Sequence, residues 1–198
     1  MTSALALLPH LCLQCSPASG RSLHASTWLA AGSVVLEEPA FASLDPSLHR
    51  GDDRRALGTL AVHVGDGTLL AALPYYLQLE PNYSLLQAHQ LGSATAATAQ
   101  ALFPAAVHTN GFTVKDNLQL CVLVASLSNH SCVPNIATSY RLSESGQPSI
   151  LFTALREIAV GEEITHSYID ASTDVTDRRL RLAPYGFLCT CAACMAGT

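Results

Sequence analysis

Positive charge is scarce in this sequence. Only 13% of the 198 residues are charged, and 10 Lys and Arg residues against 15 Asp and Glu residues give a formal net charge of −5. A protein that holds a phosphate backbone by charge needs the opposite sign, so we expect no direct nucleic-acid partner. A mildly acidic surface favours a cationic ligand such as a Lys-rich peptide, although many cytosolic proteins are acidic for solubility alone.

Long apolar runs are also absent. The longest candidates, near residues 68–79 and 118–127, are interrupted by polar residues such as Gln78 and Gln119, so neither reaches the roughly 18 residues that span a bilayer. Residues 1–15 have neither a basic n-region nor a small-residue cleavage site. We therefore expect a soluble protein without a membrane partner. We also expect it to be a monomer. We expect the compartment to be the cytosol or the nucleus. The choice between them stays open, because no cluster of Lys or Arg is evident.

The seven cysteines are an odd number, and none lies between residues 39 and 106. Their grouping favours a thiolate metal site in a reducing compartment over a disulfide framework. Three of them, at positions 189, 191 and 194, can wrap one tetrahedral zinc ion but leave it one ligand short. Cys132 is the best fourth ligand because it sits in a loop, whereas Cys121 lies in an apolar run typical of a buried thiol.

A zinc ion held by four thiolates has no open position for water. Such an ion would organise a pocket and contribute folding free energy to the tail, and it would not perform hydrolysis. Cys12 and Cys15, with His10 nearby, form half of a second site. The pair is explained equally well by two cysteines that bind no metal.

Hydrophobic spacing predicts a strand-rich chain with one helical insert. With 49% apolar residues, the chain can bury a core as one domain or as one domain plus a small appendage. Gly20–Ala25 and Val34–Glu38 are predicted to pair as a hairpin, and helical spacing fills residues 45–106. Charges after Asp170 predict an amphipathic helix. Further short strands are predicted at Gly111–Val114, Leu118–Leu123, Ile136–Arg141 and Ile150–Leu155.

Four segments carry the most specific information. They are, in order, Gly20-Arg21-Ser22-Leu23, Asn129-His130-Ser131-Cys132-Val133-Pro134-Asn135, Gly161-Glu162-Glu163-Ile164 with Ser167-Tyr168-Ile169-Asp170, and Tyr185-Gly186-Phe187 before Cys-x-Cys-x-x-Cys. From about residue 18 to 195, the chain resembles the SET-domain protein lysine methyltransferases. It is most similar to the SMYD branch, whose SET domain is followed by a cysteine-rich post-SET segment.

The resemblance implies an α+β, mainly β fold. This is the SET-domain β-clip, in which the segment bearing the Asn-His motif and the segment bearing Tyr168 form a pseudoknot. The implied parts are an N-terminal tail at 1–17, the N-terminal part of the SET domain at 18–44, an inserted helical block at 45–106, the C-terminal part of the SET domain at 107–184 and a post-SET zinc segment at 185–198.

The resemblance also assigns roles to individual residues. Tyr168 would lie beside the transferring methyl group, and Tyr185 would wall the lysine channel. S-adenosylmethionine would be contacted by Gly20, Arg21, Leu23, Asn110, Asn129, His130 and Phe187. A structural zinc ion would be held by Cys132, Cys189, Cys191 and Cys194.

Three departures from the family pattern bear on activity. Ser22 stands where the family usually has a second Gly that lets the backbone approach the cofactor. No MYND finger is expected, because residues 39–106 contain no cysteine, and the helical C-terminal domain of the branch is expected to be missing after Thr198. The peptide cleft should then be more open and its substrate selection weaker.

Two functions follow from the sequence. The first is methyl transfer from S-adenosylmethionine to a lysine side chain of a histone or non-histone protein. The alternative is a catalytically weak SET domain that acts as a zinc-stabilised peptide-binding or scaffolding module. A Cys–His nucleophile pair formed by Cys132 and His130 is disfavoured, because zinc would consume the thiolate and the two residues share one short loop.

Overall fold

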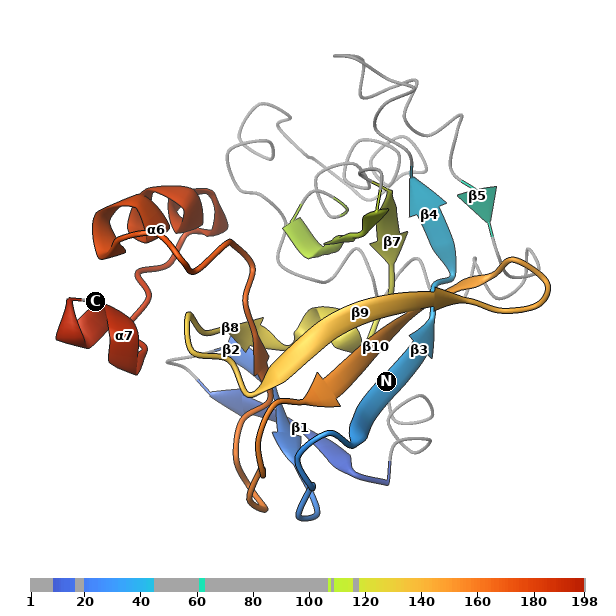
Figure 1. The fold of residues 1–198 in the computed structure, drawn as a ribbon, viewed down its shortest axis with the longest axis horizontal. Helices are drawn as coiled ribbons and strands as arrows, with labels where there is room; N and C mark the ends of the chain where they lie inside the picture. Colours follow the sequence, from blue (N-terminus) through green and yellow to red (C-terminus); the bar gives the residue numbers. More distant parts are fainter. Residues whose placement is uncertain are drawn as a thin grey trace, which may run out of the picture. The chain divides into compact units, whose positions relative to one another are not determined.

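The computed structural model describes residues 9–16, 20–44, 61–62, 107, 109–115 and 118–197. The chain divides into two compact units. The first unit comprises Met1–Glu37, Leu127–Ser139 and Leu151–Thr198, and the second comprises Glu38–Ser126 and Tyr140–Ile150. Strands outnumber helices in the described residues (Figure 1). The mainly β fold predicted from the sequence is therefore confirmed.

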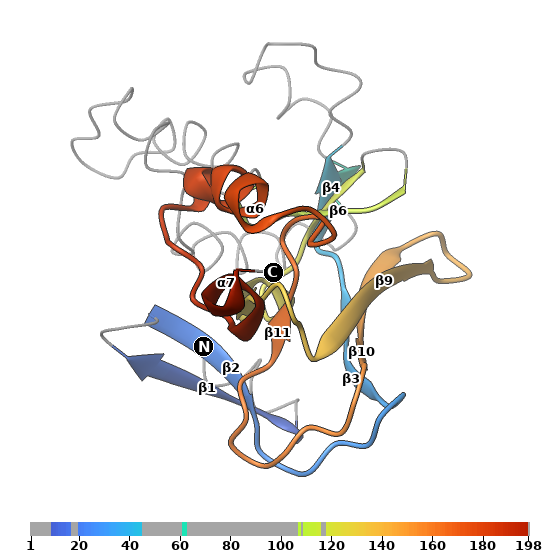
Figure 2. The same cartoon turned by 60° about the vertical axis from the view of Figure 1, so that its left-hand side comes forward.

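Strand β2 (Gly20–Ala25) forms at its predicted position, but its partner differs from the prediction. It pairs antiparallel with β1 (Leu11–Ser16), a strand inside the segment assigned to an N-terminal tail (Figure 2). The predicted hairpin with β3 (Val34–Pro39) is wrong. The reason is that the connecting backbone bonds elsewhere: Leu29 bridges to Ile158, and the Gly32 N–H donates to the Ala154 carbonyl over 2.8 Å.

Strand β3 belongs instead to a three-stranded sheet of order β3-β10-β9. Strands β9 (Ile136–Leu142) and β10 (Pro148–Ala154) confirm the two strands predicted in this region. A turn joins them, in which Gly146 has a φ of +82°. Such a φ is strained for any residue with a side chain, which explains glycine at this position.

The second unit contains a four-stranded sheet of order β5-β4-β7-β6. Its strands are β4 (Ala42–Leu44), β5 (Ala61–Val62), β6 (Phe112–Thr113) and β7 (Gln119–Cys121), and the last two confirm predicted strands. The predicted helical block at 45–106 lies outside the described residues, apart from β5. At Ala61 and Val62 the helix prediction is wrong, because their backbone pairs antiparallel with β4. Strand pairing across the fold outweighs local helical spacing at these two residues.

Within the second unit, the Glu38 carboxylate holds a backbone turn. It accepts the N–H groups of Leu123, Val124 and Ala125 at 2.7–3.0 Å. Burial raises the pKa of Glu38, although these three N–H groups oppose the shift. The turn leads along the chain into the short 3-10 helix η4 (Ala125–Leu127). Glu38 thus fixes the backbone of residues 123–125 within the second unit.

Two distant segments of the first unit meet as a parallel pair. Strand β8 (Asn129–His130) lies beside β11 (Thr165–His166), with Asn129 opposite Thr165 and His130 opposite His166. These are the segments that the family resemblance expects to lie together in the pseudoknot. The pairing places the Asn-His motif next to the chain leading into Tyr168.

The C-terminal segment forms two short helices that lie side by side (Figure 1). Helix α6 (Val175–Leu182) confirms the helix predicted after Asp170. Asp174 is its N-cap, and the Asp174 side chain accepts the N–H groups of Thr176 and Asp177. The 3-10 turn η5 (Ala183–Tyr185) ends at Gly186, and α7 (Ala192–Ala196) follows. No helix of the described segments is both long and apolar enough to cross a membrane.

Candidate functional site

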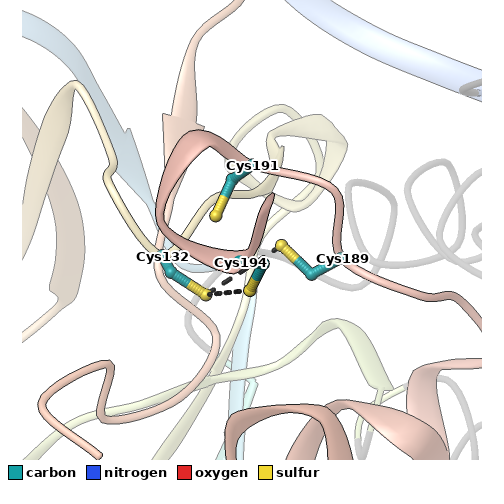
Figure 3. Close-up of side chains that lie close together, drawn as sticks. All are labelled: Cys132, Cys189, Cys191 and Cys194. Atoms are coloured by element: carbon teal, nitrogen blue, oxygen red, sulfur yellow. Dashed lines mark hydrogen bonds between the residues drawn. The ribbon is translucent and has the colours of Figure 1, made fainter. Parts of the chain in front are cut away.

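Four cysteine sulfur atoms converge in the first unit (Figure 3). Cys132 comes from the turn after β8, Cys191 caps α7 and Cys194 lies within it. The four Sγ atoms all lie within 4.8 Å of one another. The Cys132 sulfur is 3.9 Å from that of Cys189 and 3.6 Å from that of Cys194.

These distances fit a tetrahedral zinc ion. Four thiolates about 2.3 Å from one zinc ion have sulfur atoms about 3.8 Å apart. Cys189 and Cys194 are also buried, with 4% and 3% of their surface exposed, as a closed structural site requires. The four residues predicted as zinc ligands are therefore brought together in a donor set suited to zinc.

The second half-site suggested by Cys12 and Cys15 gains no further ligands. Among the described residues, only the four cysteines above form a group that could hold a metal ion. Cys12 and Cys15 lie three positions apart on strand β1. Because side chains alternate between the faces of a strand, these two thiols point to opposite sides.

A buried arginine side chain lies beside the four-cysteine cluster. Arg178 of α6 is 2% exposed, its Nη2 lies 3.9 Å from the Cys194 sulfur and its guanidinium donates to the Thr173 carbonyl. A zinc ion with four thiolates carries a net charge of about −2, so a nearby guanidinium offsets part of that charge. The sequence pattern does not mark Arg178, because its charge fits the polar face of an amphipathic helix equally well.

Tyr168 lies at the centre of an aromatic group. Its ring centroid is 5.0 Å from that of Tyr185, 5.3 Å from that of His130 and 6.3 Å from that of Phe187. Its hydroxyl donates to the Ser128 carbonyl over 2.9 Å. Burial raises the pKa of Tyr168, so the hydroxyl stays protonated at neutral pH.

Asn129 of β8 links β2 to the segment that precedes β11 in the first unit. Its Nδ2 donates to the Glu163 carboxylate over 2.7 Å and to the Arg21 carbonyl over 3.2 Å. The neighbouring Leu23 side chain is fully buried, and its carbonyl accepts the Ile164 N–H. Leu23 can therefore offer only backbone to a ligand. Gly20 begins β2 with a φ of +65°, which favours glycine at this position.

Ser22 is accommodated without strain. The His24 Nδ1 lies 2.9 Å from the Gly161 carbonyl, so Nδ1 carries the proton and Nε2 accepts a hydrogen bond. The Ser22 hydroxyl, 3.0 Å from that Nε2, donates to it. Since side chains alternate along β2, Ser22 points to the face opposite Arg21 and Leu23.

Of the predicted site residues, all but Asn110 lie in the first unit. Phe187 has its ring 6.0 Å from that of His130 and is 40% exposed. Asn110 belongs to the second unit, where its carbonyl accepts the Ser126 hydroxyl. The sequence pattern does not mark the roles of Ser128 and Glu163, because these depend on partners far along the chain.

Asn135, the last residue of the Asn-His-Ser-Cys-x-Pro-Asn motif, is buried and forms several hydrogen bonds. Its side chain donates to the Glu162 carboxylate and the Glu163 carbonyl and accepts the Thr165 N–H, over 2.7–3.0 Å. Its carbonyl accepts the Leu155 N–H. Asn135 therefore fixes the Gly-Glu-Glu-Ile segment against the Asn-His segment.

We expect Asn135→Ala to lower the free energy of unfolding by about 2–4 kcal/mol, because three buried side-chain hydrogen bonds are lost and their partners are left unpaired. Urea denaturation measures this loss. Asn135→Asp is the matched variant: it keeps the acceptor for Thr165 but sets a carboxylate against Glu162, so it should destabilise at least as much. A change below about 0.5 kcal/mol in both variants would contradict the role of Asn135.

His166 makes stability depend on pH. Burial, aided by the proximity of His130, lowers the pKa of His166 to about 3. The folded state holds this histidine neutral, whereas in the unfolded state it becomes protonated below about pH 6.5. Its contribution to the free energy of unfolding is therefore complete above pH 6.5 and falls by about 1.4 kcal/mol per pH unit below it.

Urea denaturation at pH 7 and pH 5 tests this expectation. His166→Gln removes the titrating group, so its loss of stability between the two pH values should be smaller than that of the wild type by about 2 kcal/mol. Equal losses in the two proteins would show that His166 is not held neutral in the folded state.

Comparison with known proteins agrees with this geometry. A family model described as the SET domain matches residues 20–169, which is most of the chain. The chain therefore belongs to the SET-domain family. It is 40% identical over 94 residues to the N-lysine methyltransferase SMYD2-B of Danio rerio, covering 44% of this chain and 20% of that protein.

Two further relatives are similar, one over a shorter stretch and one over a slightly longer stretch. The histone-lysine N-methyltransferase ATXR2 of Arabidopsis thaliana is 41% identical over 70 residues, covering 35% of this chain and 15% of that protein. The human N-lysine methyltransferase SMYD2 is 38% identical over 99 residues, covering 46% and 21%. The aligned stretches thus span about a fifth of these curated relatives or less.

A solved structure of a candidate histone methyltransferase from Plasmodium falciparum is also similar. It matches 81% of this chain and 93% of its own, with 12% sequence identity and a TM-score of 0.44. The assignment to the family rests on the sequence match and not on this likeness.

Proposed function

We propose that this protein transfers a methyl group from S-adenosylmethionine to a lysine side chain of a protein substrate. The observation that carries the proposal is the Tyr168 hydroxyl, buried among aromatic rings and held by the Ser128 carbonyl beside the Asn-His motif. Relatives named as lysine methyltransferases support the same activity. The substrate is a histone or a non-histone protein of the cytosol or nucleus.

The residues of the first unit fit S-adenosylmethionine. The 40% exposed ring of Phe187 offers an apolar face to an adenine. Asn129 offers its amide oxygen to the amino-acid portion, because its Nδ2 already donates to Glu163 and Arg21, and Gly20–Leu23 offer backbone. Ser22 does not oppose this fit, since its hydroxyl bonds to His24. When bound, the cofactor supplies an electrophilic methyl group on a sulfonium.

Tyr168 would act as a neutral acceptor. Its proton is committed to the Ser128 carbonyl, so the lone pairs of its oxygen remain for the polarised methyl group and the lysine amine. Contacts of this C–H···O kind contribute about 0.5–1 kcal/mol each. The Tyr168 and Tyr185 rings, 5.0 Å apart, would stabilise a methylated ammonium by about 0.5–2 kcal/mol.

Deprotonation of the lysine needs no dedicated base. A lysine amine that enters a desolvated site beside a sulfonium has a lowered pKa for both reasons. The protein would then contribute alignment of the amine with the methyl group, which accounts for most of the acceleration in such reactions. A zinc ion at Cys132, Cys189, Cys191 and Cys194 would be structural, because four thiolates leave no open coordination position.

Labelled S-adenosylmethionine tests the proposal in two stages. Equilibrium binding to the zinc-loaded protein comes first, and transfer of label to a lysine-rich protein pool follows. Binding with transfer is the expected result, and acid-stable label on lysine identifies the product. Binding of a lysine peptide without any transfer would favour the alternative, a catalytically weak SET domain that serves as a scaffold.

A further inference from the structure

His130 lies between the four-cysteine cluster and Tyr168. Its Nδ1 is 3.0 Å from the Tyr168 backbone nitrogen, and its Nε2 is 3.2 Å from the Cys132 sulfur. The two contacts are on opposite nitrogens of one ring. His130 therefore touches both a predicted metal ligand and the predicted active-site tyrosine.

The hydrogen bonds define which nitrogen carries the proton. A backbone N–H can only donate, so Nδ1 of His130 must accept from Tyr168. A neutral imidazole with an accepting Nδ1 carries its proton on Nε2, and that proton faces the Cys132 sulfur. A doubly protonated ring is excluded in this geometry, because it would set two N–H groups against each other.

We propose that His130 is a positioning residue that couples the metal cluster to Tyr168. Its Nε2–H donates to the Cys132 thiolate, and its Nδ1 holds the Tyr168 backbone. The inference rests on the zinc site and the role of Tyr168 proposed above. It adds that metal binding and placement of the tyrosine are linked through one imidazole ring.

The surroundings leave the ring and the tyrosine little room to move independently. His130 stands opposite His166 in the β8–β11 pair, and the Ser131 N–H donates to the His166 carbonyl over 3.0 Å. The Ser128 carbonyl, just before β8, accepts the Tyr168 hydroxyl. Tyr168 is thus bonded at its backbone and at its hydroxyl to the same short segment, so a change at Cys132 reaches it through His130.

Two variants of His130 separate the two halves of the link. An asparagine amide reaches about as far as Nδ1, so His130→Asn keeps an acceptor for Tyr168 but removes the donor to Cys132. A glutamine amide reaches about as far as Nε2, so His130→Gln keeps the donor and removes the acceptor. Both variants are loaded with Co²⁺, whose thiolate charge-transfer absorption reports on the electron density of the sulfur ligands.

In His130→Asn, we expect the Co²⁺ charge-transfer band to move to longer wavelength, because the thiolate loses its N–H donor. Metal affinity, measured by competition with a chelator, should fall by about 10–100-fold, as for other groups that bond to metal ligands. In His130→Gln, the band should stay in place, while the Tyr168 amide proton moves upfield in the ¹H–¹⁵N spectrum.

An unshifted band in metal-loaded His130→Asn would overturn the proposal. So would ¹⁵N spectra of the wild-type imidazole showing a protonated Nδ1, a measurement that decides the matter even if a variant fails to fold. The result is separate from the activity. A wild-type protein without methyl transfer but with the expected band shift would overturn the proposed function and leave the coupling intact.

Discussion

Replacement of Cys194 by alanine is expected to weaken zinc binding by several hundredfold. Structural zinc sites contribute about 10–16 kcal/mol, so the loss of one ligand in four removes about 3–4 kcal/mol. Cys194 is buried, and its sulfur lies 3.6 Å from that of Cys132. No other described side chain could replace it in the cluster. Chelator competition measures the affinity.

The same replacement should loosen the C-terminal segment. The side chains of Leu182, Cys189 and Cys194 form a buried cluster against which Tyr168 and Tyr185 pack. Hydrogen exchange should therefore become faster across residues 187–197, and S-adenosylmethionine binding should be lost, as it should when a chelator removes the metal from the wild type. Unchanged cofactor affinity after complete metal removal would contradict this dependence.

Cys121→Ala is the matched control. Cys121 is also a fully buried thiol, but it lies on β7 in the second unit and outside the metal-ligating group. Its replacement should cost about 1 kcal/mol of stability, as an ordinary core substitution does, and leave zinc affinity unchanged. Equal effects of Cys194→Ala and Cys121→Ala on zinc affinity would show that the four-cysteine cluster does not bind the metal.

Tyr168→Phe is expected to reduce methyl transfer by about 10–100-fold with little effect on S-adenosylmethionine binding. The hydroxyl is the only group removed, and its oxygen would make two or three weak contacts that exist only when methyl group and amine are aligned. The aromatic packing around the ring is retained. Single-turnover kinetics with saturating cofactor isolate the transfer step.

Tyr140→Phe serves as the control for this substitution. Tyr140 lies on β9, and its ring is absent from the aromatic group around Tyr168. It should retain the wild-type rate. If Tyr168→Phe transferred methyl groups as fast as Tyr140→Phe, the Tyr168 hydroxyl would have no part in the reaction.

The four-cysteine cluster could be predicted from the sequence, but the contacts around it could not. Cys132 stood out because a thiol in a polar, turn-forming stretch is rarely a core residue. Arg178 gave no such signal, since its neighbours Arg179 and Arg181 carry the same charge on the same helix. Its burial follows from the position of Cys194, a tertiary fact that helical periodicity does not contain.

A similar limit applies to the backbone partners. The Ser128 carbonyl that accepts the Tyr168 hydroxyl belongs to every residue type alike, so no sequence pattern marks it. The sequence does not indicate strand β1, because a strand of six residues with only Leu11 buried shows no clear alternation of apolar and polar residues. The β2 strand itself was predicted correctly, but the sequence does not state which of its neighbours pairs with it.

The positions of the four cysteines along the chain determine when each is synthesised. Cys132 precedes Cys194 by 62 residues, which a ribosome adding 5–20 residues per second needs about 3–12 s to make. During most of that interval, until Cys189 is made 57 residues after Cys132, the earlier thiol has no companion ligand and must be kept reduced. The methyl-donor site would therefore mature only late in translation, in a cell that supplies both reductant and zinc as the last cysteines emerge.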